Sequence, residues 1–167
     1  MTANLENILI RNELMPGDLG YVIYLHGLLY GAEYGYDIQF EMYVAAGLHE
    51  FNKNYDPAKD RVWICEYEEK IIGFLLLIHR EHNSAQLRYF LIEPKFRGIG
   101  LGKKLMDLYT KFLHECQYRS SYLWTTHELT AAAALYKRYG FKLTEEKEST
   151  AFGKSLREQR YDLLIAS

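Results

Sequence analysis

Polar turns and apolar runs alternate regularly through the middle of the chain. Residues 61–67, 71–78 and 85–92 are rich in β-branched and aromatic side chains, which favour strands. The segments between these runs, 68–70 and 79–84, are short and polar, as is typical of turns. This pattern predicts an antiparallel meander of three strands, of which 71–78 is the most apolar.

Helical periodicity flanks the meander on both sides. Residues 19–34 are apolar on nearly every face, which indicates a helix that is buried or lines a cleft, and Asp18 is expected to be its N-cap. Residues 38–53 predict a second helix with one apolar stripe. After residue 100, apolar residues recur as on one helix face that packs on a sheet: Leu101, Leu105, Leu108, Phe112 and Cys116.

Shorter segments complete the chain. A compact helix is predicted over residues 131–139, capped by Thr130 and ended by Gly140. Residues 145–155 are charged and predict a mobile connection. Further strands are predicted at residues 8–11, 121–126, 141–144 and 159–165. We therefore expect one α/β domain over residues 1–167, with a mixed sheet flanked by helices in the order β-α-α-β-β-β-α-β-α-β-β.

A glycine-rich segment joins the third strand of the meander to the next helix. Gly98, Gly100 and Gly102 stand at every second position, and Arg97 and Lys103 flank them. Glycine lets a backbone approach a ligand without a Cβ clash, and the free N–H groups at a helix N-terminus bind anions. We interpret the segment as a cradle for a diphosphate. A tight turn that binds nothing is the alternative.

Two common phosphate-binding patterns do not fit these glycines. The Walker pattern would need glycine at Arg97 and serine or threonine at Lys104. The dinucleotide pattern G-x-G-x-x-G differs from the G-x-G-x-G spacing in this chain. The pattern that fits is R-x-x-G-x-G between a strand and a helix, so a P-loop phosphotransferase is not supported.

Composition narrows the class of protein further. The chain has 167 residues, 49% hydrophobic and 25% charged, with a formal net charge of −2, so it carries no basic footprint for nucleic acid. Its longest apolar run is much shorter than the ~20 residues of a membrane helix, and its first residues do not resemble a signal peptide. Cys65 and Cys116 are expected to be reduced thiols, which suits a cytoplasmic protein.

Two segments in combination resemble a known family. The R-x-x-G-x-G loop is followed, roughly thirty residues later, by an L-Y-x-x-x-G-F segment that runs from Leu135 to Phe141. Together with the order of elements, these segments are similar to the GCN5-related N-acetyltransferases (GNAT family), which implies a mostly antiparallel GNAT-like sheet. Residues 20–27, 85–91 and 123–126 most resemble the acetyltransferase half of MarR-type regulator fusions.

The resemblance implies acetyl-CoA as cosubstrate and no metal. The diphosphate would be held by Arg97, Gly98, Ile99, Gly100, Leu101, Gly102 and Lys103. Pantetheine and the thioester would lie at Phe90, Leu91 and Ile92, where this strand splays from the strand at 122–125. The family often has asparagine seven residues before its tyrosine. This chain has Leu129 there, so either Thr126 or Glu128 replaces that contact or the contact is lost.

The resemblance also implies that Tyr136 is the general acid that protonates the leaving thiolate. The general base stays open. His26, Glu33 and Glu41 lie on the two helices that usually wall the acceptor cleft, and a water relay is equally compatible. Gln86 stands where some relatives carry a glutamate base, and an amide cannot take up the proton.

The expected reaction is direct transfer of an acetyl group to a primary amine of a small molecule or a protein. No nucleic acid or membrane is expected as a partner. A non-catalytic module that binds or senses acyl-CoA is the alternative. Dimers are common in the family, and the last strand or the second helix is able to mediate a homodimer.

Overall fold

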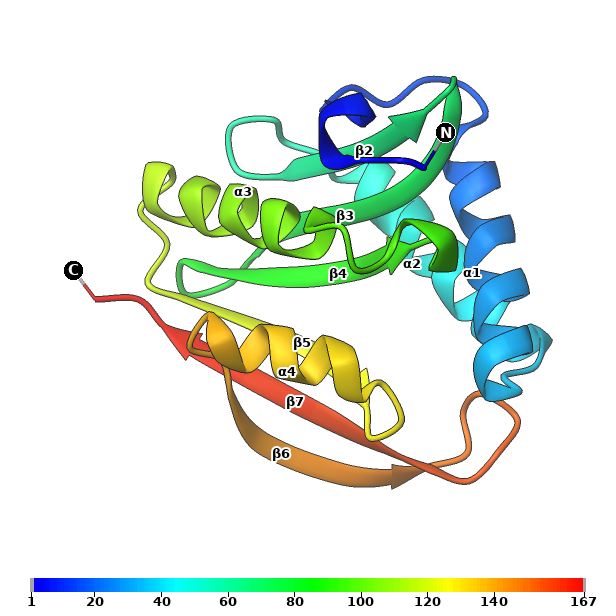
Figure 1. Ribbon diagram of the computed structural model, residues 1–167. Helices are drawn as coiled ribbons and strands as arrows, with labels where there is room; N and C mark the ends of the chain where they lie inside the picture. The colour runs from blue at the N-terminus through cyan, green and yellow to red at the C-terminus, as the bar shows by residue number, and fades with distance from the viewer. Residues whose placement is uncertain (1, 167) are drawn as a thin grey trace.

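Seven strands form one sheet in the order β1-β2-β3-β4-β5-β7-β6 in the computed structural model, which describes residues 2–166 (Figure 1). The strands are β1 (Leu9–Arg11), β2 (Arg61–Tyr67), β3 (Lys70–Arg80), β4 (Ser84–Ile92), β5 (Ser120–Thr126), β6 (Lys142–Ser149) and β7 (Leu156–Leu164). All neighbouring strands are antiparallel except the pair β4 and β5. The expected GNAT-like α/β fold, its mixed and mostly antiparallel sheet and its order of elements are therefore confirmed.

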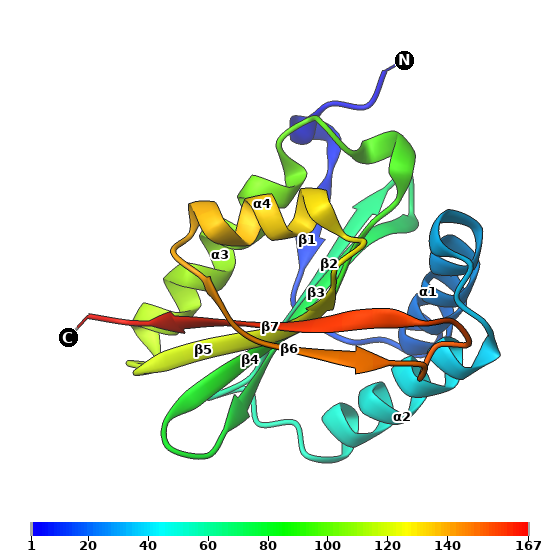
Figure 2. The same ribbon diagram turned by 90° about the horizontal axis from the view of Figure 1, so that it is seen from below.

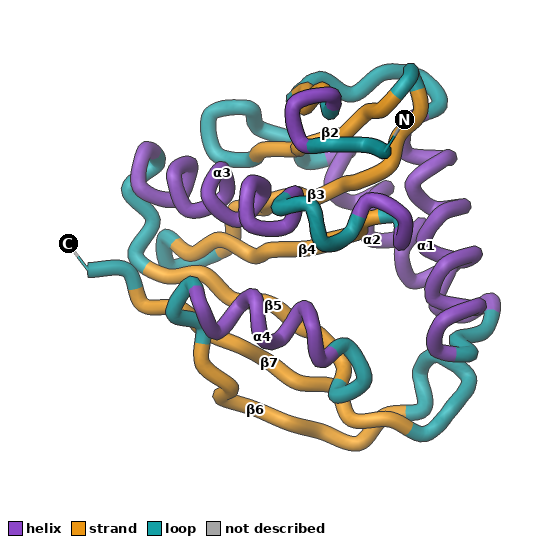
Figure 3. The backbone as a smooth tube through the Cα atoms, viewed as in Figure 1, coloured by secondary structure: helices purple, strands orange, loops and turns teal. Residues whose placement is uncertain are grey.

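Helices cover both faces of this sheet (Figures 2 and 3). The helices are α1 (Asp18–Tyr34), α2 (Ile38–Lys53), α3 (Leu101–Glu115) and α4 (Thr130–Arg138), with short 3₁₀ turns at Leu5–Asn7 and Pro94–Phe96. α3 and α4 pack on one face, and α1 and α2 pack on the other. No helix within residues 2–166 has the length and hydrophobicity to span a membrane.

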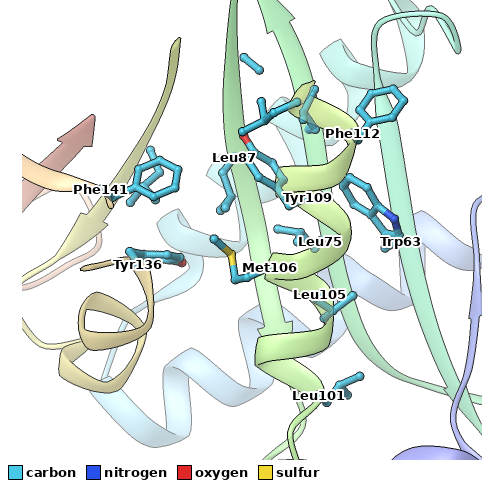
Figure 4. Close-up of a cluster of buried hydrophobic side chains, with 14 of the residues drawn as sticks. Trp63, Leu75, Leu87, Leu101, Leu105, Met106, Tyr109, Phe112, Tyr136 and Phe141 are labelled. Carbon is cyan, nitrogen blue, oxygen red and sulfur yellow. The ribbon is translucent and has the colours of Figure 1, made fainter. Parts of the chain in front are cut away.

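Strand β3 shows how the sequence pattern builds two cores. Its side chains alternate in direction along the strand. Leu75 and Leu77 face the α3 side, together with Trp63 and Tyr109 (Figure 4). Phe74, Leu76 and Ile78 face the α1 and α2 side. Because both faces are covered, β3 is apolar along nearly its whole length.

The sheet divides between β4 and β5. These parallel strands pair only at three positions, Ser84 with Ser120, Ala85 with Ser121 and Gln86 with Tyr122, and then diverge (Figure 1). Just beyond the last pair, β4 carries a bulge: its register against β3 shifts where Tyr89 takes a left-handed conformation (φ +58°). The divergence leaves the inner edges of both strands without a backbone partner.

Three local predictions are wrong. The segment predicted as a mobile connection is partly strand, since β6 extends to Ser149, and only residues 150–155 connect it to β7, which begins at Leu156. β6 has nearly every side chain exposed and lies at the sheet edge, where charged side chains discourage pairing with other chains, so it lacks an apolar pattern. Asp18 and Thr130 are first helical residues. Gly17 and Leu129 occupy the N-cap positions.

Candidate active site

The glycine-rich segment forms the turn between β4 and α3, as the sequence predicts. Gly98 and Gly100 have φ values of +78° and +93°, and Gly100 is the N-cap of α3. Residues other than glycine avoid this left-handed region. No side chain caps α3, and its first turn carries no acidic residue. Its first N–H groups are therefore available to an anion.

A cavity opens beside this loop, at the mouth of the split in the sheet. We call it the loop cavity; it encloses about 900 Å³ of empty space, including its open mouth. It is lined by Tyr30, Glu33, Tyr34, Phe90, Leu91, Ile92, Arg97, Gly98, Gly102, Leu129, Ala131, Ala132 and Leu135. A Cβ at Gly102 would lie 3.3 Å from the Leu135 side chain, so glycine here keeps the space between α3 and α4 open.

Arg97 links the loop to α1. Its Nη1 and Nη2 donate to the two carboxylate oxygens of Glu33 at 2.9 and 2.7 Å, and its Nε donates to the Ile92 carbonyl at 2.9 Å. The hydrogen bonds that Arg97 donates to Glu33 raise the pKa of Arg97 above its ordinary value. Glu33 thus lies at the loop cavity, bound to the residue that was expected to face the diphosphate.

A second cavity lies deeper in the split, and we call it the aromatic cavity. It encloses about 720 Å³ of empty space, including its opening. It is lined by His26, Tyr30, Tyr36, Phe40, Tyr43, Val44, Gln86, Leu87, Arg88, Tyr89, Phe90, Trp124, Thr125, Thr126, Leu129, Tyr136, Phe152 and Glu158. Tyr30, Phe90 and Leu129 line both cavities, so the two spaces adjoin.

Tyr136 projects from α4 and lines the aromatic cavity next to Phe90, which lines both cavities. Its ring is 5% exposed and meets Phe90 edge-on, with 6.2 Å between ring centroids. Figure 4 shows the hydroxyl at the end of the ring that points away from α4. Burial raises the pKa of Tyr136 well above its ordinary range. The phenol therefore stays protonated at neutral pH and keeps a proton to donate.

His26 reaches the aromatic cavity from α1. Its Nδ1 lies 2.8 Å from the Val22 carbonyl oxygen, which can only accept, so Nδ1 carries the proton. The other ring nitrogen, Nε2, is buried without a hydrogen-bond partner among residues 2–166. Burial lowers the pKa of His26 to about 4. The ring is thus neutral at pH 7, with a lone pair on Nε2.

The other expected residues differ in what they touch. Leu91 and Leu101 are buried in the core, and Ile99 is packed against it. Lys103 pairs with Asp107 at 3.0 Å. Thr126 shares a 2.7 Å hydrogen bond with Tyr36 and lines the aromatic cavity, while Glu128 pairs with Lys154 at 2.9 Å. Glu41 packs beside Gly27 and lines neither cavity.

Several lining residues were not predicted from the sequence. Phe152 closes the aromatic cavity from the connection between β6 and β7, which had been predicted to be mobile. Arg88 belongs to the apolar strand β4 and Glu158 to β7. The sequence did contain a signal for Arg88, because a single positively charged residue stands inside an otherwise mostly apolar strand. Within residues 2–166, no group of three or more His, Cys, Asp or Glu side chains could hold a metal ion, and both cysteines are free.

Known proteins share this architecture. The solved acetyltransferase from Streptococcus agalactiae has a TM-score of 0.78 at 22% identity, over 96% of this chain and 100% of that one. A GNAT family acetyltransferase from Elizabethkingia anophelis, solved with acetyl-CoA bound, has a TM-score of 0.65 at 16% identity, over 96% and 99% of the two chains. At these identities the likeness shows the fold.

Curated relatives are more similar in sequence. The uncharacterized N-acetyltransferase YjgM of Escherichia coli is 32% identical over 66% of this chain and 69% of its own length. N-acetylaspartate synthetase of Danio rerio is 27% identical over 72% of this chain but only 45% of its own length. The relation to MarR-type regulator fusions stays a prediction. The model of the acetyltransferase (GNAT) family matches residues 29–141, and the chain belongs to that family.

Proposed function

We propose that the protein transfers the acetyl group of acetyl-CoA to a primary amine, by direct attack of the neutral amine on the thioester, with Tyr136 as the general acid. One observation carries the proposal: Tyr136 lines the aromatic cavity and packs against Phe90, which lines both cavities. α4 lines the first cavity through Leu135 and the second through Tyr136. One space would then take the coenzyme and the other the amine.

The residues around the loop cavity fit acetyl-CoA. The uncapped N-terminus of α3 and the left-handed glycines suit a diphosphate. The unpaired edges of β4 and β5 suit an extended, amide-bearing arm that takes the place of a strand. A Cβ at Gly102 would intrude on this space. When bound, the coenzyme supplies an acetyl group already activated as a thioester.

His26 is the favoured partner for the amine. Its Nε2 is a buried hydrogen-bond acceptor at the cavity wall, so it can receive an N–H of the incoming amine and orient the nitrogen lone pair. The imidazole has a low pKa. The imidazole can therefore accept the N–H proton only once the amine has attacked, when that proton becomes strongly acidic. Glu33 remains a second candidate, although its carboxylate is bound to Arg97.

Tyr136 would act on the leaving group. A neutral phenol in the wall of the aromatic cavity can donate its proton to the thiolate as the carbon–sulfur bond breaks. General acid catalysis of this kind contributes typically 10²- to 10⁴-fold to rate. The class of amine acceptor also needs a proposal. One relative is named for making N-acetylaspartate, so amino acids belong in the set of acceptors to be tested.

The test is acetyl-CoA consumption and thiol release with a panel of amines, amino acids and lysine peptides. We expect turnover with at least one class of amine and micromolar binding of coenzyme A by calorimetry. Binding without turnover on any amine would contradict the proposal, and would favour a module that senses acyl-CoA.

A further inference from the structure

The aromatic cavity carries two charged side chains of opposite sign. Arg88 and Glu158 are its only lining residues of these types, and the neutral His26 adds no charge. Neither side chain forms an ion pair with any residue in the part of the chain that the structure describes, nor do they pair with each other. By contrast, Arg97 at the loop cavity is neutralised by Glu33.

Arg88 is held in place by aromatic rings instead of a carboxylate. Its guanidinium lies 4.6 Å from the centroid of the Tyr89 ring and 5.4 Å from that of Tyr43. Its single side-chain hydrogen bond within residues 2–166 runs from Nη2 to the Tyr43 hydroxyl at 3.1 Å. A guanidinium has five N–H donors in a planar fork, so most of its donors are unused.

Among residues 2–166, no carboxylate pairs with Arg88. A planar guanidinium matches a carboxylate with two parallel hydrogen bonds, and the two tyrosine rings already fix its orientation. Glu158, on β7 across β5, would repel a doubly charged phosphate but would favour a nearby ammonium group. The pair of charges is therefore complementary to a molecule with both an amine and a carboxylate.

We propose that Arg88 binds the carboxylate of the acceptor, and that the acceptor is a small amino acid that carries a free amine and a free carboxylate. This inference rests on the proposed acetyltransferase function. It makes Arg88 the residue that selects acceptors with a carboxylate over simple amines. Glu158 would attract the acceptor as an ammonium ion, which loses its proton to solvent before it reacts, and the Nε2 of His26 would face the neutral amine that results.

The experiment compares matched acceptors that differ only in the carboxylate: alanine with ethylamine, and lysine with cadaverine. Steady-state thiol release gives kcat/KM for each, with the wild type and with R88Q, R88K and R119Q. Arg119 is an exposed arginine before β5 that lines neither cavity. Removing it matches the charge change of R88Q. Calorimetry with coenzyme A shows whether each variant keeps its loop cavity.

We expect the wild type to prefer the carboxylate-bearing member of a pair, and R88Q to lower kcat/KM for that member roughly 30- to 100-fold, since hydrogen bonds to charged groups are involved. The simple amine should change less than about threefold. R88K should lose an intermediate factor, because an ammonium cannot form the planar fork. R119Q should behave as the wild type.

Two results would overturn the inference alone: equal use of both members by the wild type, or an equal loss for both members in R88Q and R88K. Turnover of lysine peptides in place of free amino acids would also overturn it. If no amine is turned over while coenzyme A still binds, the proposed function fails first and this inference fails with it.

Discussion

The helix that carries His26 fixes its chemical state. The side chain donates from Nδ1 to the carbonyl one turn earlier, and the ring stacks on Tyr30 with 5.7 Å between centroids. The hydrogen bond selects the tautomer with Nε2 as the acceptor, and burial keeps the ring neutral. A buried acceptor without a partner costs stability, and at a cavity wall that cost is consistent with a binding role.

The state of His26 predicts how stability depends on pH. The pKa of His26 is lowered to about 4 in the fold, while the unfolded chain titrates near 6.5. Below pH ~6.5, His26 binds a proton in the unfolded state but stays neutral in the folded state. The free energy of unfolding therefore falls as the pH drops towards 4. Between pH 7 and pH 4.5, the free energy of unfolding measured in urea should fall by on the order of 2 kcal/mol more for the wild type than for H26L. Parallel losses in the two proteins would show that His26 does not titrate this way.

Tyr136 supports a second prediction at the same scale. Y136F removes only the hydroxyl from a ring that is packed by Phe90, Phe141 and Tyr161, so the fold should persist. We expect kcat to fall about 10²-fold or more, with the affinity for coenzyme A within about twofold of wild type. Single-turnover kinetics and calorimetry measure the two quantities. An unchanged kcat would remove the acid role.

Among the elements, the strand, loop and helix around residues 84–115 could be predicted almost to the residue. Their apolar periods and glycines are local signals. Only the start of β6 could be predicted, as a strand over residues 141–144, because the rest of this edge strand carries exposed charged residues and buries nothing that leaves a pattern. The aromatic cavity could not be predicted from local patterns either. It is built from side chains such as His26, Arg88 and Phe152, which are brought together only by the split in the sheet.

The close contact between Gly47 of α2 and Tyr89 in the β4 bulge leads to a further prediction. A Cβ at Gly47 would overlap the Tyr89 hydroxyl, which is buried without a hydrogen-bond partner among residues 2–166. G47A should therefore cost about 1–3 kcal/mol of unfolding free energy through overpacking. In a Y89L background the same change should be nearly neutral or stabilising, because alanine is about 1 kcal/mol better than glycine inside a helix. Urea denaturation of the four proteins tests this coupling; equal costs of G47A in both backgrounds would contradict it.

At the scale of the whole molecule, the sheet consists of two parts that share little backbone pairing. β1 to β4 form one part and β5 to β7 the other, and three residue pairs at one end of β4 and β5 connect them. At the open end, the backbone N–H of Asp37 donates to the Phe152 carbonyl at 3.0 Å, and Lys154 donates to the Tyr34 carbonyl at 2.9 Å. The candidate active site thus occupies a seam of the sheet where β4 and β5 do not pair with each other.

A ligand that lies in this seam should stabilise the entire protein. Coenzyme A that binds the folded state alone adds about 2.7 kcal/mol at a concentration 100 times its Kd, which for a chain of this size raises Tm by roughly 5–10 °C. Scanning calorimetry with and without coenzyme A measures the shift. Hydrogen exchange should show new protection at residues 90–92 and 123–126, which have no partner across the split.

The matched control is G102L. Its added side chain would project between α3 and α4 into the loop cavity at a helical position with an ordinary φ, and leucine is a better helix former than glycine. The variant should therefore fold and yet show no coenzyme-dependent rise in Tm. An equal rise in both proteins would place the coenzyme outside the loop cavity. If the wild type shows no rise in Tm either, binding in the seam is contradicted. Either of these two results would show that the glycine-rich loop is a turn that does not bind the coenzyme.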